Sequence, residues 1–342
     1  MKYEIDFPDL GCWCEKIPQY DEYRFHIAEY TCREMIKVPP NVNGVPVTEV
    51  FFQPDHAVHY NLSVSKTILK KVYITKDIRK IEKSGECYKY MIPEIIIDEN
   101  NPYFCVYNGV LYRGDRLLFA TNVCGDPYEV LSGTREICGG NVLTGLSKVI
   151  LPSSIRKVDW YALSCCEQIE VFDNVSAEIR YANDESFELT VRSHESGELI
   201  YKLYFPKSEY YNYHITENRN MRNLNFAFYD NSFDELDVDV DFGDRFNVCL
   251  DRLMYPYRLS KSAEERYKKF ISDNGTKAVM NIIDSDNFEL FDFLLGLGAV
   301  VPENLEELTE YCVRREKIEF TALLLAYKER HFPGEIGSIS LE

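Results

Sequence analysis

Five short runs with alternating apolar and polar positions recur along the first half of the chain. They are Lys71–Ile74, Glu94–Ile97, Glu129–Ser132, Lys148–Leu151 and Glu170–Asp173. Their first residues lie 23, 35, 19 and 22 positions apart, and three of these spacings are near the roughly 20–29 residues of a leucine-rich repeat. Because one short strand cannot bury a face alone, the runs predict a solenoid in which stacked neighbours close the core.

A second element follows the runs at a fixed offset. Asp77–Ile81, Gly133–Ile137 and Ser154–Val158 share an apolar, basic, polar, apolar rhythm. The one long spacing is explained by an inserted hairpin at Tyr107–Tyr112 and Leu117-Leu118, in which a glycine suits a turn that needs positive φ.

These segments carry a resemblance to a known family. Leu146–Val158 reads Leu-x-x-Val-x-Leu-Pro-x-Ser-Ile-x-x-Val, which resembles the BspA-like, or treponemal-type, leucine-rich repeat. The segment Val38–Val50 and the inserted hairpin are similar to the same family. The resemblance covers about residues 20–175 and implies a leucine-rich-repeat solenoid. The repeats are few, and Phe51–Ser65 departs from the pattern.

The pattern then changes twice. Phe187–Val191 and Leu199–Phe205 alternate around a Ser196-Gly197 turn signal, which predicts a β-hairpin, and Ser208–Arg222 is expected to be a loop or linker. From about Phe233 the apolar period moves toward 3.6 residues, which predicts helices.

The helical region repeats itself about thirty residues later. Leu294-Leu295 and Leu324-Leu325 occupy equivalent places, Ser262-x-x-Glu265 is a capping-box signature, and Asn274-Gly275 is a helix stop signal. These hairpins resemble degenerate ankyrin repeats without their Thr-Pro-Leu-His signature. The order of elements is also similar to uncharacterised proteins of gut Firmicutes.

The fold class expected is therefore α+β. Residues 1–175 form a leucine-rich-repeat solenoid with an N-terminal cap, residues 176–228 a β-hairpin and linker region, and residues 229–342 an ankyrin-like array of helical hairpins.

Charge and cysteine content narrow the classes of partner. The net charge of −18 argues against binding to nucleic acid and to anionic membranes. The chain begins without a signal-peptide pattern, and its 11 cysteines are expected to be reduced thiols in a cytoplasmic protein.

Common catalytic and metal motifs are missing from the sequence. No nucleotide-binding loop, dinucleotide fingerprint, His-Glu-x-x-His or Gly-x-Ser-x-Gly occurs, so no catalytic residue and no cofactor is expected. Asp237-x-Asp239-x-Asp241 lacks the glycine and glutamate of a calcium loop. Cys12-x-Cys14 and Cys165-Cys166 are favoured as structural cysteines over metal ligands. Arg113-Gly114-Asp115 is expected to be a hairpin turn.

The alternation along the five runs also predicts a binding face. We expect the outward side chains of Tyr73, Ile96, Leu131, Ile150 and Phe172 to stack in register as an apolar stripe beside a charged stripe of Lys71, Glu94, Glu129, Lys148 and Glu170. An exposed apolar stripe usually marks an interface. The alternative is that the chain covers the stripe itself, with the 187–205 hairpin or a helix.

The sequence thus favours a non-catalytic scaffold that binds an unknown protein through the solenoid sheet, the helical array, or both. An alternative is an enzyme or effector with unfamiliar chemistry in residues 176–260, which predicts a deep pocket of converging polar side chains there. A third hypothesis is a homo-oligomeric structural module.

Overall fold

The computed structural model divides the chain into two compact units, Met1–Asn225 and Phe226–Glu342. The structure describes residues 5–7, 10, 12–28, 30–31, 33–53, 67–84, 92–139, 143, 146–159, 161–163, 166–179, 186–207, 221–234, 236 and 240–333. The Asp237-x-Asp239 pair, Cys165 and most of the 208–222 segment lie outside these residues.

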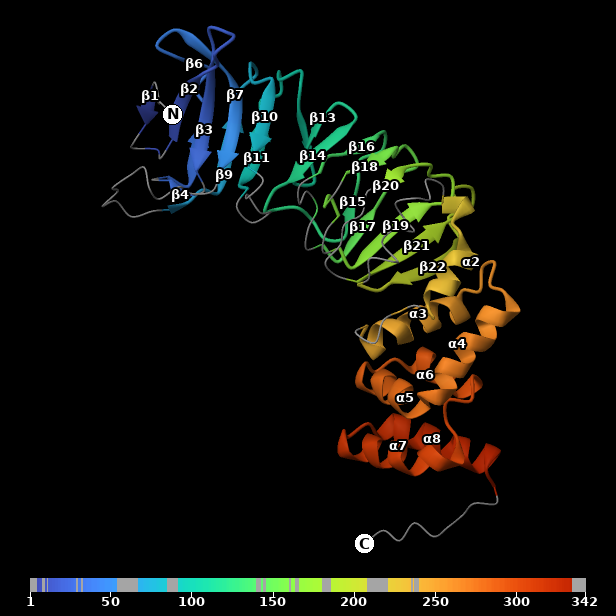
Figure 1. The fold of residues 1–342 in the computed structure, drawn as a ribbon. Helices are drawn as coiled ribbons and strands as arrows, with labels where there is room; N and C mark the ends of the chain where they lie inside the picture. The colour runs from blue at the N-terminus through green and yellow to red at the C-terminus, as the bar shows by residue number, and fades with distance from the viewer. Residues whose placement is uncertain are drawn as a thin grey trace. The chain divides into compact units, whose positions relative to one another are not determined.

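The first unit is a β-solenoid of about six turns, in which the chain passes back and forth between two pairs of sheets (Figure 1). We call one pair the front sheets. They are formed by β5 (Met35–Lys37), β9 (Lys71–Ile74) and β11 (Glu94–Ile97), and by β15 (Tyr128–Glu129), β17 (Lys148–Ile150), β19 (Gln168–Phe172), β21 (Phe187–Arg192) and β22 (Leu199–Phe205). All of the predicted runs therefore contribute to the front sheets.

We call the other pair the back sheets. The first contains β1 (Ile5–Phe7), β2 (Cys12–Lys16), β3 (Tyr23–Ala28), β7 (Val45–Gln53) and β10 (Lys80–Lys83), with β6 (Asn41–Val42) beside β7. The second contains β12 (Cys105–Tyr107), β13 (Val110–Arg113), β14 (Arg116–Ala120), β16 (Glu136–Ile137), β18 (Lys157–Val158) and β20 (Glu178–Ile179). A separate small sheet pairs β4 (Tyr30–Thr31) with β8 (Thr67–Ile68).

Parallel pairing and inward apolar side chains hold the turns together. Val72 pairs with Ile95 in the front sheets, and Ile137 pairs with Val158 in the back sheets. All four side chains are buried, so Val72 and Ile95 point inward as the alternation of the runs predicts, whereas Ile97, two residues after Ile95, is only partly buried. The rhythm that follows each run is explained as well, because it supplies the strands β10, β16 and β18.

The long spacing between the second and third runs holds the predicted hairpin. Strands β12, β13 and β14 form an antiparallel meander, and Gly109 turns the chain at φ +75. A Cβ at Gly109 would lie 2.7 Å from backbone atoms of Cys124, so only glycine fits. The meander joins the solenoid through β14, which pairs in parallel with β16.

A chain of hydroxyl groups fixes the meander against the next turn. The Leu131 N–H donates to the Tyr112 hydroxyl at 3.2 Å, and the Tyr128 hydroxyl donates to the Tyr107 carbonyl at 3.2 Å. The two hydroxyls lie 2.6 Å apart, so the Tyr112 hydroxyl donates to that of Tyr128. Both tyrosine side chains are fully buried.

The predicted hairpin is confirmed as β21 and β22, which pair antiparallel. It extends the second front sheet, because β21 pairs in parallel with β19 over Gln168–Phe172. The Tyr201 hydroxyl donates to the carbonyl of Met221, at the start of the 3-10 helix η2 (Met221–Asn223), at 2.7 Å. The hairpin therefore adds two strands at the edge of the sheet and does not cover the sheet's outward face.

The second unit is helical, as predicted (Figure 1). Its helices are α2 (Phe226–Ser232), α3 (Phe242–Met254), α4 (Lys261–Asp273), α5 (Gly275–Asp284), α6 (Phe288–Gly296), α7 (Pro302–Arg314) and α8 (Ile318–His331). Helix α4 begins two residues earlier than the capping-box signature indicated, because Ser260 caps it by accepting from the Ala263 N–H. Asn274 ends α4, but Gly275 starts the next helix directly.

A buried ion pair joins the first three helices of this unit. The Arg252 guanidinium donates from Nε to Asp230 Oδ1 at 2.7 Å and from Nη2 to Asp230 Oδ2 at 3.1 Å. The Tyr267 hydroxyl also donates to Asp230 Oδ1, at 2.8 Å. A buried charge of this kind is tolerated only with its partner and its hydrogen bonds, so the pair fixes how α2, α3 and α4 meet.

Two helical hairpins then stack with the predicted thirty-residue repeat. Asp286 and Glu316 occupy equivalent turn positions and both have positive φ. The ring of Phe288 stacks on that of Phe320 with centroids 4.3 Å apart, and Lys317 Nζ pairs with Asp286 Oδ1 at 2.5 Å.

Candidate binding surfaces of the solenoid

The predicted apolar stripe lies on or beside the strands of the front sheets, and its five side chains are partly exposed. Tyr73 and Ile96 are direct partners across β9 and β11. Tyr73 is 37% exposed, and its partner on β5 is the exposed Lys37. Met35, which is 55% exposed, lies on the same face of β5 but opposite Lys71. Ile96, Leu131, Ile150 and Phe172 are each half-buried.

The expected single register of the stripe is wrong in the second front sheet. Ile150 pairs with Glu129 on one side and with Glu170 on the other. The offset arises because Tyr128 is buried opposite Val149, which shifts the β15 run by two residues relative to the alignment by first residues.

The other two members of the stripe follow from this shift. Leu131 lies beyond the end of β15, and Phe172 pairs with Arg192 at the end of β21. Neither is level with Ile150, so the five side chains do not form one row.

Ion pairs divide the apolar positions of the second front sheet. Glu170 is 7% exposed and accepts from Lys148 Nζ at 2.6 Å and from Arg192 Nε at 2.9 Å. In the first front sheet, the pair of Lys71 and Glu94 at 2.8 Å lies beside Tyr73 and Ile96 rather than between them. The continuous apolar part of the stripe is therefore the pair of Tyr73 and Ile96 on β9 and β11, with Met35 on the same face of β5.

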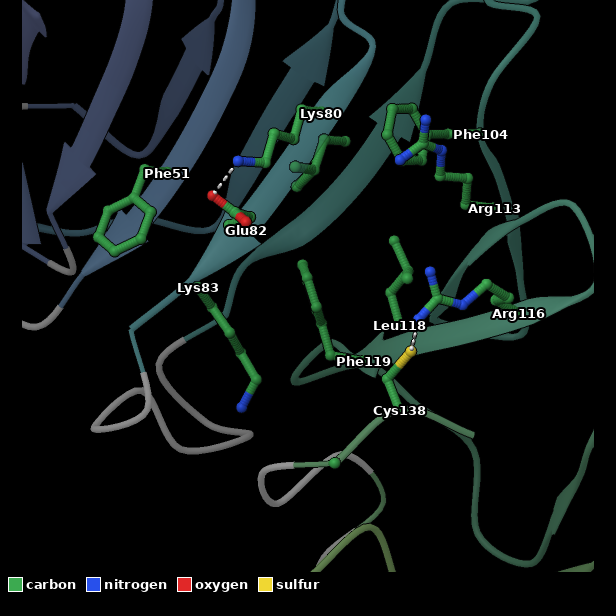
Figure 2. Close-up of a pocket in the computed structure, with 12 residues that line it drawn as sticks. Phe51, Lys80, Glu82, Lys83, Phe104, Arg113, Arg116, Leu118, Phe119 and Cys138 are labelled. Atoms are coloured by element: carbon green, nitrogen blue, oxygen red, sulfur yellow. Dashed lines mark hydrogen bonds and ion pairs between the residues drawn. The ribbon is translucent and has the colours of Figure 1, made fainter. Parts of the chain in front are cut away.

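A pocket of about 490 Å³ opens on the back sheets, away from the predicted stripe. Figure 2 shows Lys80 and Glu82 of β10 on one wall and Arg113, Arg116 and Cys138 on another. The pocket is also lined by Phe51, Ile81, Lys83, Phe104, Leu118, Phe119 and Gly139. Four cationic side chains and one carboxylate thus line an otherwise apolar hollow.

The outward face of the first back sheet leads to this pocket with alternating charges. Glu15, Arg24, Glu49 and Lys80 follow one another across β2, β3, β7 and β10. Arg24 Nη2 lies 2.6 Å from Glu49 Oε2, and Lys80 Nζ lies 4.0 Å from the same oxygen. The row ends at the pocket with a cation.

The outward face of the second back sheet leads to the pocket from the other direction. Arg113, Arg116, Glu136 and Lys157 follow one another across β13, β14, β16 and β18. Glu136 pairs with Arg116 at 2.7 Å and with Lys157 at 3.2 Å. This row begins at the pocket with two cations side by side.

Sequence analysis missed this pocket. It recognised Arg113-Gly114-Asp115 as a turn, which is confirmed by the β13–β14 hairpin and by Gly114 at φ +60. The available signal was Lys80 at the polar position of the second element, together with Arg113 and Arg116, which flank the turn.

A polar cluster forms where the β21–β22 turn meets β19. Asp173 Oδ1 accepts from the His194 backbone N–H at 2.9 Å and lies 2.8 Å from His194 Nδ1, while Asp173 Oδ2 accepts from Arg222 Nε at 2.8 Å. Burial would raise the pKa of Asp173, but these hydrogen bonds and the Arg222 charge lower it to about 2. The cluster ties three segments together and uses both carboxylate oxygens in doing so.

The cysteine side chains favour structural roles. Burial raises the pKa of Cys14 to about 12 and raises those of Cys105, Cys249 and Cys312. Burial also raises the pKa of Cys138 in the pocket, although Arg116 beside it works in the opposite direction. A nucleophilic cysteine needs a lowered pKa, so these five thiols are not activated.

Over the described part of the chain, no group of three or more His, Cys, Asp or Glu side chains is placed to hold a metal ion. None of the described helices combines the length and apolar character needed to cross a membrane. Comparison with known proteins found no match, since no family model, no curated protein and no solved structure matches the chain.

Proposed function

We propose that the chain is a non-catalytic scaffold that binds a protein partner through the outward face of its front sheets. The observation that carries the proposal is the apolar patch that Tyr73 and Ile96 form on β9 and β11. The two residues are direct partners there, and the exposed Met35 lies on the same face of β5, diagonal to Tyr73. Exposed aromatic and aliphatic side chains that lie together on a rigid sheet are the usual centre of a protein interface.

The surrounding charges support the same proposal. The pair formed by Lys71 and Glu94 lies at the edge of the apolar face. A polar rim around an apolar centre is the common anatomy of a protein interface. Leu131, Ile150 and Phe172 lie on the second front sheet among ion pairs, so we assign them to the margin of the interface.

The proposal includes membership of the BspA-like leucine-rich-repeat proteins and an ankyrin-like helical array. Support comes from the repeated strand register of the solenoid and from the thirty-residue repeat of the helical hairpins. A cytoplasmic location belongs to the same proposal. It is supported by the reduced thiols of Cys14, Cys105, Cys138, Cys249 and Cys312.

The test is site-specific photo-crosslinking in native cells. A photoreactive residue at Tyr73 or Ile96 should give one discrete protein adduct, and the same residue at Val123, an exposed position outside the front sheets, should not. Adding Met35→Glu should remove the Tyr73 adduct while the circular dichroism of the protein stays unchanged. Equal adducts at Val123, or no adduct at Tyr73 and Ile96, would contradict the proposal.

A further inference from the structure

We propose that the pocket on the back sheets binds a small organic anion, with an oxyanion group held by arginine and an apolar body against the phenylalanine walls. This inference is independent of the proposed function, because it concerns the other pair of sheets and a different set of residues.

The charges along the back sheets follow a pattern that breaks at the pocket. On each side of the pocket the outward row alternates in sign, from Glu49 to Lys80 on one side and from Arg116 to Glu136 on the other. At the pocket the alternation fails, since Lys80, Arg113 and Arg116 all line it. One negative group between them would restore the alternation from one back sheet to the next.

Arg113 occupies an electrostatically unfavourable position. It stands opposite Arg116 across the β13–β14 hairpin, where two like charges are unfavourable. Arg116 has a carboxylate partner in Glu136 at 2.7 Å. Within the described part of the chain, Arg113 contacts no carboxylate at ion-pair distance, and its guanidinium lies 5.9 Å from the centre of the Phe104 ring. Arg113 is the cation that a ligand would neutralise.

The pocket already contains one carboxylate, that of Glu82. Glu82 lies 2.9 Å from Lys80 Nζ and so belongs to the β10 wall. In Figure 2 this pair lies across the pocket from Arg113 and Arg116. Glu82 therefore pairs with Lys80, and the two arginines on the opposite wall are available to a bound anion.

The other side chains that line the pocket are mostly apolar. Phe51, Phe119 and Leu118 give the hollow an apolar surface, and about 490 Å³ is within the usual range for a small-molecule site. A guanidinium presents donors in a planar fork that matches a carboxylate or a phosphate. A ligand that combines an oxyanion with an aromatic or aliphatic body therefore matches both parts of the pocket.

A second hollow of the solenoid shows the contrast. It is lined by Thr48, Lys76, Asp77 and Arg79 among others. There Arg79 donates to Glu22, which also accepts from the Thr48 hydroxyl at 2.8 Å. Its arginine is paired with a carboxylate of the protein itself, whereas Arg113 has no carboxylate at ion-pair distance among the described residues.

The experiment uses the full chain and three probes. These are 2-naphthoate, which has both parts of the proposed ligand, 2-naphthamide, which has the ring without the charge, and inorganic phosphate, which has the charge without the ring. Calorimetric titration at low salt should give 2-naphthoate at least about tenfold higher affinity than either other probe, because charge-assisted hydrogen bonds and ring burial then act together.

Variants and a chemical footprint locate the site. Arg113→Gln should weaken 2-naphthoate binding at least about tenfold, because it removes the charge-assisted hydrogen bonds. Arg135→Gln, an exposed arginine of the next turn, should leave it unchanged. Bound 2-naphthoate should also slow alkylation of Cys138 in the pocket wall but not of the exposed Cys105, as measured on peptides by mass spectrometry.

Each other result counts against the proposal. Equal affinity for 2-naphthoate and 2-naphthamide would show that the pocket does not recognise an oxyanion. Equal affinity for phosphate and 2-naphthoate would show that it does not recognise an apolar body. Binding that survives Arg113→Gln, or that leaves Cys138 unprotected, would place the ligand elsewhere on the chain.

Discussion

Arg113 and Arg116 face each other directly across the two residues that turn the β13–β14 hairpin. Such a pairing of like charges costs stability in a sheet. Two adjacent arginines are also unexpected in a protein of net charge −18, in which acidic residues outnumber basic ones. Sites that bind a ligand are commonly less stable than an alternative sequence would make them. The pairing therefore has a measurable consequence for stability.

Replacing Arg113 by glutamate should stabilise the solenoid unit. Arg113→Glu would place a carboxylate opposite Arg116, and the free energy of unfolding should rise by about 0.5–1 kcal/mol at low salt. The gain should shrink at about 0.5 M salt because screening weakens surface charges. Tryptophan fluorescence during denaturant unfolding is a suitable signal, since the buried Trp13 belongs to the first unit.

The matched control is Arg135→Glu. Arg135 lies 3.8 Å from Asp115, so this change removes an attraction where the first removes a repulsion. It should lower the stability by up to about 0.5 kcal/mol. A fall in stability for Arg113→Glu as well would show that the arginine pair is not unfavourable.

The buried tyrosine pair should couple the inserted meander to the repeat that follows it. Tyr128→Phe leaves the Tyr112 hydroxyl and the Tyr107 carbonyl without their partner and should cost about 1–2 kcal/mol. Adding Tyr112→Phe should cost less than in the wild-type background, because the contact is already lost. Tyr20→Phe, at an exposed position, should have no effect. Additive losses from the two buried changes would contradict the coupling.

The same pair predicts a dependence on alkaline pH. Burial raises the pKa values of Tyr112 and Tyr128 above the ordinary value near 10. A raised folded-state pKa gives stability that is complete below the unfolded-state pKa and is lost as the pH rises past it. Unfolding should therefore become easier above about pH 10, and less steeply so in the double phenylalanine variant.

The elements that could be predicted from sequence are those defined by local periodicity. The alternation at Lys71–Ile74 and Glu94–Ile97 became strands with those bounds, and the hairpin of residues 187–205 is where the pattern indicated. Gly109 was identified from a backbone requirement that no other residue meets as easily. In each case neighbouring residues carry all of the information that the element needs.

The register and the pocket could not be predicted because they depend on residues distant in sequence. The buried Tyr128 before Glu129 decides which residue lies opposite Ile150, and the five runs aligned by their first residues do not show it. The pocket combines Lys80 with Arg113 and Cys138, which come from three separate strands or their ends. Whether neighbouring side chains there have the same or opposite charge depends on how the two back sheets are placed next to each other.

Acid should weaken the solenoid unit through Asp173. Its pKa is about 2 in the folded protein against 3.8 for the free side chain. A lowered folded-state pKa gives stability that is present above the unfolded-state pKa and is lost as the pH falls toward 2. The contribution is about 2 kcal/mol, so wild type and Asp173→Asn should differ at pH 6 and converge near pH 2.

Arg222→Gln separates the causes of that shift. Removing the guanidinium deletes the hydrogen bond and the charge on Asp173 Oδ2, so the pKa of Asp173 should rise while the His194 contacts remain. The carboxyl carbon resonance of Asp173 reports this pKa directly. An unchanged midpoint in Arg222→Gln would show that His194 alone holds the carboxylate.

Gly275 should be the least replaceable of the described glycines in the helical unit. A Cβ at this position would lie 2.2 Å from the carbonyl oxygen of Ala299, which also accepts from Asn304 Nδ2 at 2.9 Å. The backbone must shift to admit a methyl group, so Gly275→Ala should cost about 3 kcal/mol in stability. Gly296→Ala is the matched control, because nothing lies within 4 Å of its Cβ position, and it should be neutral or stabilising by up to about 1 kcal/mol. The helical circular dichroism signal during denaturant unfolding measures both, and equal effects of the two changes would show that α5 does not pack against Ala299 this closely.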